Sequence, residues 1–566
     1  MKKLLVVVLL LAGFVRLVGG EVPLDLEATA APVQDAYWYL EAAQGAADGS
    51  AVDPQPAYDR PLWVGIARAW FAVFGTGLGS SRALGASFGV LSVLAVWLAL
   101  ARENRRAALL ASLLLAVSYP FAGLARAPLI YTPLAALMTL VFALHGREGW
   151  RERALAWVLL AVLAFAFKSV ALVLAPGLLL RDLARLEKKK RVALVLGAVL
   201  VAGLGVALAR VLEPNELDRN VDRIHRYSGH LDAGAWKRIV LAPYLSGLVG
   251  LAPGLLGLAG VGATRWRRPL VLGALGWAAT VIFGLALLDY RPLRFYALAG
   301  PPLALLAGVG VDALLAAGAK KKPAPVVAGL VVASGAAFYL TGRASGLAAP
   351  LGIGASLLVA IFSLPAFPVA RRLAVSLLVL TVLHDLGQFS RDHMTWKRGV
   401  TPWEANRMIQ DALGPHAVLV GPYASALAAG SRIQRRRAPE LKGGPFAHEG
   451  IAVAASGGFT HVALDREQDA SGQLAAGFAR EGEPLTLVLA VPVRNQFLLV
   501  YRFKSATRAG YELSPYERAL DAPEPVASIQ ELHVWWKLHP VAFLTLKVRK
   551  GETLDEHEVR AYFGAH

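Results

Sequence analysis

The chain contains no cysteine. This absence excludes disulfide bonds, thiolate metal sites and a cysteine nucleophile, so any metal would be held by carboxylate, imidazole and water. Charged residues are also scarce, at 17% of 566 residues, whereas hydrophobic residues make up 56% and the mean hydropathy is +0.50. A soluble protein is difficult to build from this composition. The sequence therefore predicts a polytopic α-helical membrane protein.

Apolar runs recur from residue 4 to about residue 387, whereas the last third of the chain mixes charged and apolar residues as a globular domain does. The runs are near the roughly 20 residues that cross a bilayer as a helix, and they predict about thirteen spans. The short runs beside residues 119–126 and beside Lys168 are alternatively parts of broken helices. The predicted spans are 4–18, 82–100, 107–119, 129–144, 153–167, 170–180, 192–212, 239–261, 270–288, 295–316, 326–340, 351–367 and 373–389.

The formal net charge of +18 comes from 58 Lys and Arg against 40 Asp and Glu. From Arg391 onward the two signs nearly balance, so the surplus lies in the membrane part, where it indicates orientation rather than nucleic-acid binding. With Lys2 and Lys3 in the cytoplasm, every second loop is basic, as the positive-inside rule requires. An odd number of spans then predicts a multi-pass membrane protein with an extracytoplasmic C-terminal domain. The basic loops are 102–106, 147–153, 181–191, 265–268, 320–322 and 371–372.

The first twenty residues have two interpretations. Lys2 and Lys3 precede an apolar core, as in a signal peptide, but the segment lacks a small-residue cleavage site and carries Arg16. We favour a retained first helix, with a cleaved signal peptide as the alternative.

The same pattern predicts a transmembrane domain over residues 1–390 and an extracytoplasmic α/β domain over residues 391–566. Two external loops, 20–80 and 213–238, are long, and long ordered loops usually carry function. The first of them contains a predicted interfacial helix, Pro61–Phe74, whose aromatic side chains suit the membrane boundary.

In the C-terminal part, helical and strand patterns alternate as in a small layered α/β domain. The run Arg435–Arg437 is interpreted as a solvated face, or alternatively as a contact for anionic headgroups or glycan phosphates. No catalytic constellation is evident, which favours a support or acceptor-binding role for this domain. We expect helices at 403–413, 424–430, 472–481 and 554–563, strands at 417–420, 460–464, 532–536 and 540–548, and a hairpin of 485–491 with 496–503.

The first external loop holds two acidic motifs. Gln34-Asp35-Ala36-Tyr37-Trp38-Tyr39 follows the first predicted span, and Tyr58-Asp59-Arg60-Pro61-Leu62 enters the predicted interfacial helix. An acid followed by aromatic residues at a membrane face suits sugar chemistry, because a carboxylate accepts a proton while rings stack on a sugar or lipid chain. A solvated Asp within an aromatic belt is the alternative interpretation.

In their order and position these motifs resemble the GT-C superfamily of glycosyltransferases that use lipid-phosphosugars, especially the branch of the lipid A aminoarabinose transferase and relatives of protein O-mannosyltransferases. In that pattern an acidic pair and an aromatic stretch open the first external loop, and an acidic-basic-Pro segment follows. Gln34 stands where many members have an acid, so Asp35 alone carries the first motif. Later segments also fit the pattern: Arg126-Ala127-Pro128-Leu129, Phe167-Lys168-Ser169 and Arg294-Phe295-Tyr296.

The resemblance implies a GT-C-like fold in a bacterial-type inner (plasma) membrane, where membrane lipids surround the protein. It also implies transfer of a sugar from a polyprenyl-phosphate donor to a periplasmic lipid, glycan or protein. Asp35 is the candidate general base, and Asp59 orients the acceptor or holds a metal. Cationic side chains suit the donor phosphate, and a lysine between apolar runs is usually functional, although Lys168 alternatively snorkels to the interface. The phosphate-binding candidates are Arg60, Lys168, Arg294 and Arg126, and the substrate-binding candidates are Tyr37, Trp38, Tyr58 and Tyr296.

A divalent metal is a further implication of the resemblance. In the aminoarabinose branch the acid that matches Asp59 binds a metal together with a histidine from a later loop, which here would be His225 or His230. Carboxylate and imidazole suit zinc or manganese, and magnesium is a third candidate. Two histidines in a charged loop are alternatively solvated.

Two other classes of function remain open from the sequence. A transporter or flippase of a lipid-linked saccharide would also be polytopic, but it should show internal repeats with matching interrupted helices, and we find no such repeat. A non-catalytic receptor would use the C-terminal domain to bind an external ligand. The acid-rich first loop favours the transferase.

Overall fold

The computed structural model forms two compact units, one of residues 1–18, 86–125 and 130–389, and one of residues 19–85, 126–129 and 390–566. The residues that it describes are 2–17, 39–40, 42–44, 60–126, 129–186, 269–286, 293–317, 375, 378–379, 382, 385, 402–414, 416–421, 424–428, 434–436, 458–465, 484–493, 496–508, 511–532 and 538–552.

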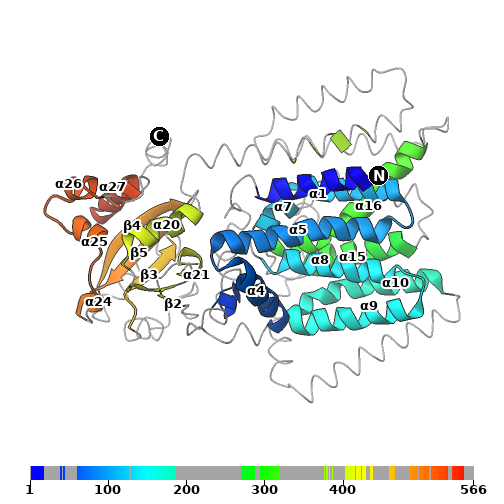
Figure 1. Ribbon diagram of the computed structural model, residues 1–566, viewed down its shortest axis with the longest axis horizontal. Helices are drawn as coiled ribbons and strands as arrows, with labels where there is room; N and C mark the ends of the chain where they lie inside the picture. Colours follow the sequence, from blue (N-terminus) through cyan, green and yellow to red (C-terminus); the bar gives the residue numbers. More distant parts are fainter. Residues whose placement is uncertain are drawn as a thin grey trace, which may run out of the picture. The chain divides into compact units, whose positions relative to one another are not determined.

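The first unit is helical, and its helices lie side by side with their axes roughly aligned (Figure 1). Among the described residues, one helix, Gly79–Leu100, is long and apolar enough to cross a membrane, and four helices are apolar but shorter. The predicted spans between 192 and 261 and between 326 and 367 lie outside the described residues. The helices are α1 Lys2–Leu17, α5 Leu78–Leu100, which begins in the second unit, α6 Arg105–Val117, α7 Tyr119–Arg126, α8 Tyr131–His145, α9 Trp150–Val162, α10 Ala175–Arg185, α15 Pro269–Ala286 and α16 Gly300–Ala317.

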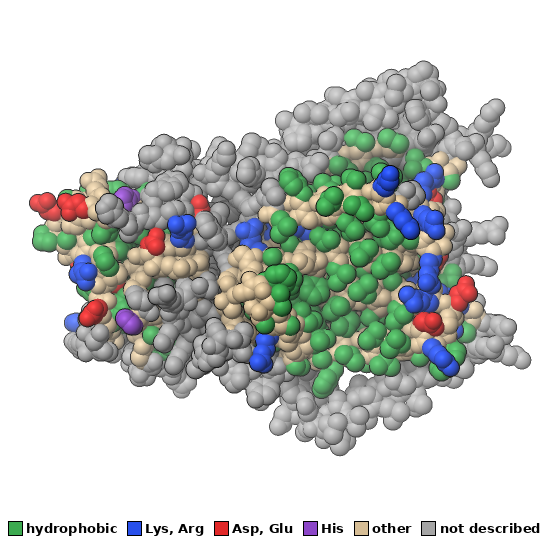
Figure 2. Space-filling view, in the orientation of Figure 1, with side chains coloured by type: hydrophobic (Ala, Val, Ile, Leu, Met, Phe, Trp, Pro, Cys, Tyr) green, Lys and Arg blue, Asp and Glu red, His purple; other side chains and the backbone are tan. Residues whose placement is uncertain are grey.

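Large apolar side chains are exposed along this unit. Leu10 and Phe14 on α1 are 68% and 61% exposed, and beyond α9 Phe165 is 89% exposed. Figure 2 shows hydrophobic side chains over most of the visible face of the unit, with Lys and Arg gathered near its edges. An apolar surface of this kind is expected where lipid, not water, surrounds the protein.

The two short runs around Lys168 form an antiparallel pair of segments. α9 continues as a π-helix, Leu163–Phe167, and the chain returns through a 3-10 helix, Ser169–Leu174, into α10. Arg153 near the start of α9 lies 3.7 Å from Asp182 near the end of α10. The runs are therefore two segments that fold back on each other, with Lys168 at the turn.

The first helix is an integral part of the helical unit. Arg16 is 1% exposed, and its guanidinium donates to the carbonyl oxygens of Ala116 at 2.9 Å and Leu115 at 3.2 Å. These carbonyls belong to the last turn of α6, where a cation is favourable. Gly89 leaves room for this side chain, because a Cβ there would fall 2.5 Å from Nε of Arg16. Retention of the first helix stays a prediction.

In the described residues of the C-terminal part, five strands form a sheet in the order β2-β1-β3-β5-β4. β1 pairs in parallel with β2 and β3, and β5 pairs antiparallel with β3 and β4. Most of the described buried apolar side chains of the strands and helices form one cluster, and Leu487, Ala490 and Leu499 form a smaller one. The strands are β1 Val418–Val420, β2 Gln434–Arg436, β3 His461–Asp465, β4 Leu485–Val493 and β5 Gln496–Phe503, and the helices are α20 Pro402–Ala412, α21 Ala424–Leu427, α24 Lys504–Arg508, α25 Pro515–Leu520, α26 Pro525–Gln530 and α27 Leu538–Arg549.

The predicted hairpin and the predicted strands at 417–420 and 460–464 are confirmed, but the strand predicted at 540–548 is wrong. This segment belongs to α27, whose Leu538, Val541, Ala542 and Thr545 are buried at helical spacing. A short apolar run does not by itself distinguish a strand from a buried helix. Part of the run Arg435–Arg437 forms the edge strand β2. The predicted segments 472–481, 533–536 and 554–563 lie outside the described residues.

A buried polar network ties α25 to the sheet. Glu517, with no exposed side-chain surface, accepts hydrogen bonds from His461 Nε2 at 3.1 Å, Arg502 at 3.2 Å and the Tyr511 hydroxyl at 2.8 Å. Ser514 and Glu517 also form a capping box at the start of α25. Burial by itself raises the pKa of Glu517. The hydrogen bond and charge of His461 and the hydrogen bonds of Ser514 and Tyr511 outweigh this effect and lower the pKa to about 2.

Candidate functional site

Lys168 lies where the helical backbone is interrupted. Its N–H donates to the carbonyl of Leu163 at 2.8 Å, which closes the π-helix. Lys168 itself is extended, with φ −168° and ψ 131°, and precedes the 3-10 helix. Such irregular backbone is uncommon inside helices and often marks a functional position. The interruption places the lysine at the turn between two apolar segments.

The ammonium group of Lys168 is held by two aromatic residues. Nζ lies 2.6 Å from the hydroxyl oxygen of Tyr131, 4.5 Å from the centroid of its ring and 5.8 Å from the ring centroid of Phe295. The two rings are 4.9 Å apart and tilted by 54°, a favourable aromatic arrangement. We call Lys168, Tyr131 and Phe295 the Lys168 cluster.

Three segments that are distant in the sequence build this cluster. Tyr131 is the first residue of α8, and Phe295 lies in a 3-10 helix, Leu293–Ala299, that leads directly into α16. Arg294 and Tyr296 are the neighbours of Phe295 in this 3-10 helix, but their side chains are outside the described part. The fold therefore brings the segments of two phosphate-binding candidates, Lys168 and Arg294, together.

A second polar cluster lies at the other end of α8. Buried His145, the last residue of α8, lies 3.0 Å from Asp182, which also accepts from Trp157 at 3.3 Å. Arg185 donates to the carbonyls of His145 and Gly146, both at 3.1 Å. These contacts pin α8, α9 and α10 to one another. We call His145, Asp182, Trp157, Arg153 and Arg185 the Asp182 cluster.

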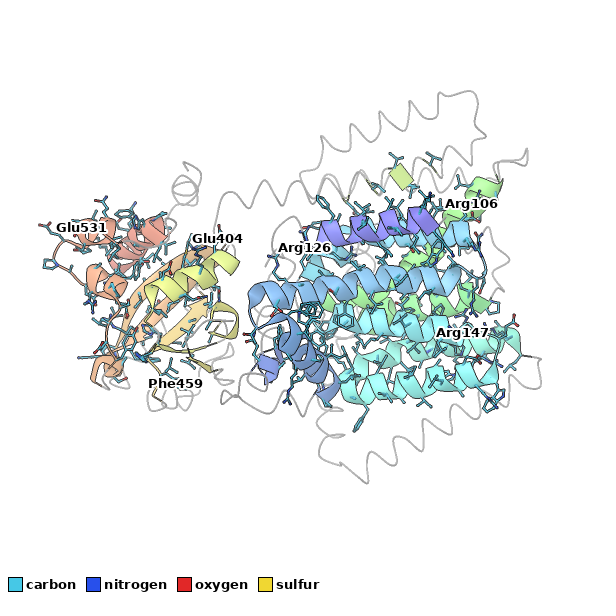
Figure 3. All side chains as sticks on the ribbon, viewed as in Figure 1. Arg106, Arg126, Arg147, Glu404, Phe459 and Glu531 are labelled. Carbon is cyan, nitrogen blue, oxygen red and sulfur yellow. The ribbon has the colours of Figure 1, made fainter. Side chains whose placement is uncertain are left out.

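The two clusters mark opposite ends of the helical unit. α8 has 15 residues, and at 1.5 Å per residue it separates them by about 20 Å. Figure 3 shows Arg106 and Arg147 at one end of the unit, and Arg147 follows His145 closely in the chain. These arginines belong to the predicted cytoplasmic loops 102–106 and 147–153. The Lys168 cluster is then at the predicted external end.

Two further phosphate-binding candidates belong to the second unit. Arg60 is half-buried and immediately precedes α4, Pro61–Phe74. This helix has the bounds predicted for the interfacial helix, with Trp63 and Phe71 buried on one side and Val73 and Phe74 exposed. Arg126 ends α7 and is buried. The convergence of these arginines with Lys168 stays a prediction.

The other candidates lie outside the described residues: Asp35, Tyr37, Trp38, Tyr58, Asp59, His225 and His230. The proposed base and metal ligands therefore also stay predictions. Within the described part of the chain, no group of three or more His, Asp or Glu side chains could hold a metal ion.

Sequence analysis missed Tyr131 as a partner of Lys168. Tyr131 follows the motif Arg126-Ala127-Pro128-Leu129 by two residues. This closeness to a candidate motif was the one feature of the sequence that could have identified it as a site residue. Phe295 lay within a quoted motif but was not assigned a role. No local spacing pairs these residues with Lys168, because the three meet only through the packing of α8 and two 3-10 helices.

No family model and no curated protein matches the chain. Solved structures do match it, and they show that the chain has a GT-C-like fold, as the sequence resemblance implies. A similar structure is apo ArnT from Cupriavidus metallidurans, at 18% identity and a TM-score of 0.53, with 88% of this chain and 97% of that chain covered.

Two further structures are similar. ArnT from the same organism, bound to undecaprenyl phosphate, has 17% identity and a TM-score of 0.52, again with 88% of this chain and 97% of that chain covered. The oligosaccharyltransferase AglB from Archaeoglobus fulgidus, in complex with an inhibitory peptide and a dolichol-phosphate, has 13% identity and a TM-score of 0.46, with 99% and 85% covered.

Proposed function

We propose that the chain is a GT-C glycosyltransferase that transfers a sugar from a polyprenyl-phosphate donor to a lipid, glycan or protein on the periplasmic face of the inner membrane. The observation that carries the proposal is Lys168, placed at a break between two apolar segments and oriented by Tyr131 and Phe295. ArnT, which shares the fold, was solved with undecaprenyl phosphate bound, and this supports a lipid phosphate as the ligand.

A polyprenyl-phosphate sugar has its chain in the bilayer and its phosphate at the interface. A site for it therefore needs cations at membrane depth, where an ammonium group is costly and is retained for a function. Lys168 supplies a point charge, and Arg294 would add a bidentate guanidinium from the adjoining 3-10 helix. Arg60 and Arg126 are proposed as further cations.

In the proposed reaction the acceptor attacks the anomeric carbon of the sugar. The bond between this carbon and the phosphate oxygen breaks, and its electron pair stays on the phosphate. The acceptor's proton passes to the carboxylate of Asp35, the proposed general base. Tyr37, Trp38, Tyr58 and Tyr296 are proposed to hold the sugar and acceptor by stacking.

A divalent metal is proposed for the site, because the carboxylate of Asp59 and the imidazole of His225 or His230 form a donor set that suits zinc or manganese. A bound zinc or manganese ion would add positive charge beside the donor phosphate. In its absence Asp59 is proposed to orient the acceptor.

The Asp182 cluster favours a transferase over a transporter. Alternating access requires both ends of a helical unit to open in turn. Here buried polar contacts pin α8, α9 and α10 together at the end opposite Lys168. A transferase needs a site that is open to one side only, so contacts that close the other end are compatible with an enzyme.

A covalent assay tests the proposal. Purified full-length protein is incubated with a polyprenyl-phosphate sugar and candidate acceptors, and the release of polyprenyl phosphate is measured. We expect release with the wild-type protein and a loss of about 10² to 10⁴ in rate for Asp35→Asn, because the variant keeps the size of the side chain but not its proton acceptor. Wild-type rates in Asp35→Asn would remove the base assignment. Movement of intact donor across the membrane without release would support a transporter.

A further inference from the structure

We propose that the Tyr131 hydroxyl binds the leaving phosphate directly, with Lys168 as the group that fixes its direction. This inference rests on the proposed function and adds a residue that the sequence motifs do not include. Tyr131 is 2% exposed, and its hydroxyl oxygen is 2.6 Å from Nζ of Lys168.

The direction of this hydrogen bond follows from the chemistry of the two groups. An ammonium group only donates hydrogen bonds, whereas a phenol both donates and accepts. The oxygen of Tyr131 is therefore the acceptor in this bond, so the hydroxyl proton is directed away from Lys168 and is proposed to be donated to the phosphate when the lipid binds. Contact with a cation also polarises the hydroxyl and strengthens its donation. Tyr131 and Lys168 together present several N–H and O–H donors at one position.

The aromatic packing fixes where these donors lie. The Tyr131 ring rests against Phe295, 4.9 Å between centroids, and Phe295 lies in the 3-10 helix that also contains Arg294. The four-carbon side chain of Lys168 is flexible in itself, and its bond to a buried tyrosine restricts it. A preorganised set of donors of this kind is effective where negative charge develops.

Charge develops on the phosphate during the proposed transfer. The donor is a phosphodiester with one negative charge, and the released polyprenyl phosphate has two once the anomeric bond has broken and the proton has passed to the base. A hydrogen-bond donor of the protein that binds the dianion more strongly than the monoanion lowers the barrier, because its interaction with the phosphate grows toward the transition state. The Tyr131 hydroxyl is proposed to act in this way without itself losing a proton.

The test measures lipid binding to the full-length protein in nanodiscs. The two probes are polyprenyl phosphate, a dianion, and its methyl ester, a monoanion like the donor. We expect Tyr131→Phe to weaken the binding of polyprenyl phosphate about tenfold, the effect of one hydrogen bond to a charged group, and to change the binding of the methyl ester much less. Equal effects on both lipids, or no effect on either, would overturn the proposal.

Two variants separate the hydroxyl from packing. Phe295→Leu removes the ring contact and keeps the hydroxyl, so it should reduce the preference for the dianion less than Tyr131→Phe does. An equal loss in both variants would assign the effect to packing. In a Lys168→Met background, Tyr131→Phe should have a smaller effect than in the wild type, because the lysine no longer directs the hydroxyl. If the effects of the two substitutions on the binding free energy are fully additive, the side chains act independently, and the role of Lys168 in directing the hydroxyl is overturned.

A control and one general outcome complete the test. Tyr501→Phe, in β5 of the other compact unit, should bind both lipids as the wild type does. A wild-type protein that binds neither lipid would overturn the proposed function, and the role of Tyr131 with it. A wild type that binds polyprenyl phosphate while Tyr131→Phe binds it equally well would overturn the role of Tyr131 alone.

Discussion

The ammonium group of Lys168 donates to the hydroxyl oxygen of Tyr131 at 2.6 Å. The bond joins the turn between two antiparallel apolar segments to the first residue of α8. At this position the charge of the lysine is stabilised by a hydroxyl and two aromatic rings. The arrangement holds a cation at the end of the helical unit where the lipid phosphate is proposed to bind.

Replacement of Lys168 should impair transfer without unfolding the protein. Lys168→Met keeps the apolar length of the side chain and removes the cation, so we expect the rate of polyprenyl phosphate release to fall on the order of 10²-fold, the usual cost of one preorganised donor. Lys550→Met, at an exposed position in the C-terminal domain, is the matched control. An unchanged rate in Lys168→Met would place the phosphate elsewhere.

The predicted topology can be tested with single cysteines, because the chain contains none of its own. A membrane-impermeant maleimide applied to intact spheroplasts should label Glu524→Cys in the C-terminal domain. Glu148→Cys and Lys321→Cys, in predicted cytoplasmic loops, should react only after permeabilisation. Labelling of all three from one side would contradict an odd number of spans.

Loss of the carboxylate at position 182 should destabilise the helical unit. Asp182 is bonded to His145 and Trp157 and lies near Arg153. Asp182→Asn removes the charge beside Arg153 and weakens the hydrogen bonds of two buried groups, which typically costs about 1–3 kcal/mol. We expect a lower midpoint of thermal unfolding in detergent, whereas Glu148→Gln at an exposed position should behave as the wild type. An unchanged midpoint for Asp182→Asn would show that the cluster is not stabilising.

Acid should destabilise the C-terminal domain through Glu517. The pKa of this group is about 2 in the folded state against an ordinary value of 4.5, so its contribution is complete above pH 4.5 and is lost as the pH falls toward 2. The shift corresponds to about 3 kcal/mol in the free energy of unfolding. Burial also lowers the pKa of His461, opposed by its bond to Glu517, so this group too favours folding less as the pH falls below 6.5.

Hydrogen exchange of the β3 and β5 amides in the full-length protein measures this effect. Protection should decrease from pH 5 to pH 2, after correction for the intrinsic exchange rate. Glu517→Gln should lower protection at pH 7 and flatten the dependence below pH 5. A variant with the pH dependence of the wild type would show that another group is responsible.

The sequence predicted those features that depend on local patterns. The bounds of α4 follow from Pro61 and an apolar run, and the hairpin of β4 and β5 follows from two apolar strands close together in the chain. The strand predicted at 540–548 was wrong because an apolar run of that length suits both a strand and a helix. The shorter a segment is, the less its local pattern distinguishes a strand from a helix.

The candidate site was predictable only in part. Lys168 is recognisable because a charge between two apolar runs is costly, whereas Tyr131 looks like any aromatic residue at the start of a helix. The bond between them is created by packing of segments that lie far apart in the sequence, and no spacing rule includes it. The sequence therefore predicts the cation, Lys168, whereas its partner Tyr131 is identified only from the tertiary contacts.

A structure of the full-length protein with polyprenyl phosphate, determined by electron cryomicroscopy in nanodiscs, tests the central claim most directly. The account predicts density for the phosphate within hydrogen-bond distance of Nζ of Lys168 and of the Tyr131 hydroxyl, with the lipid chain running into the bilayer beside the helical unit. Density for the phosphate at another position, with Lys168 directed toward lipid, would contradict it.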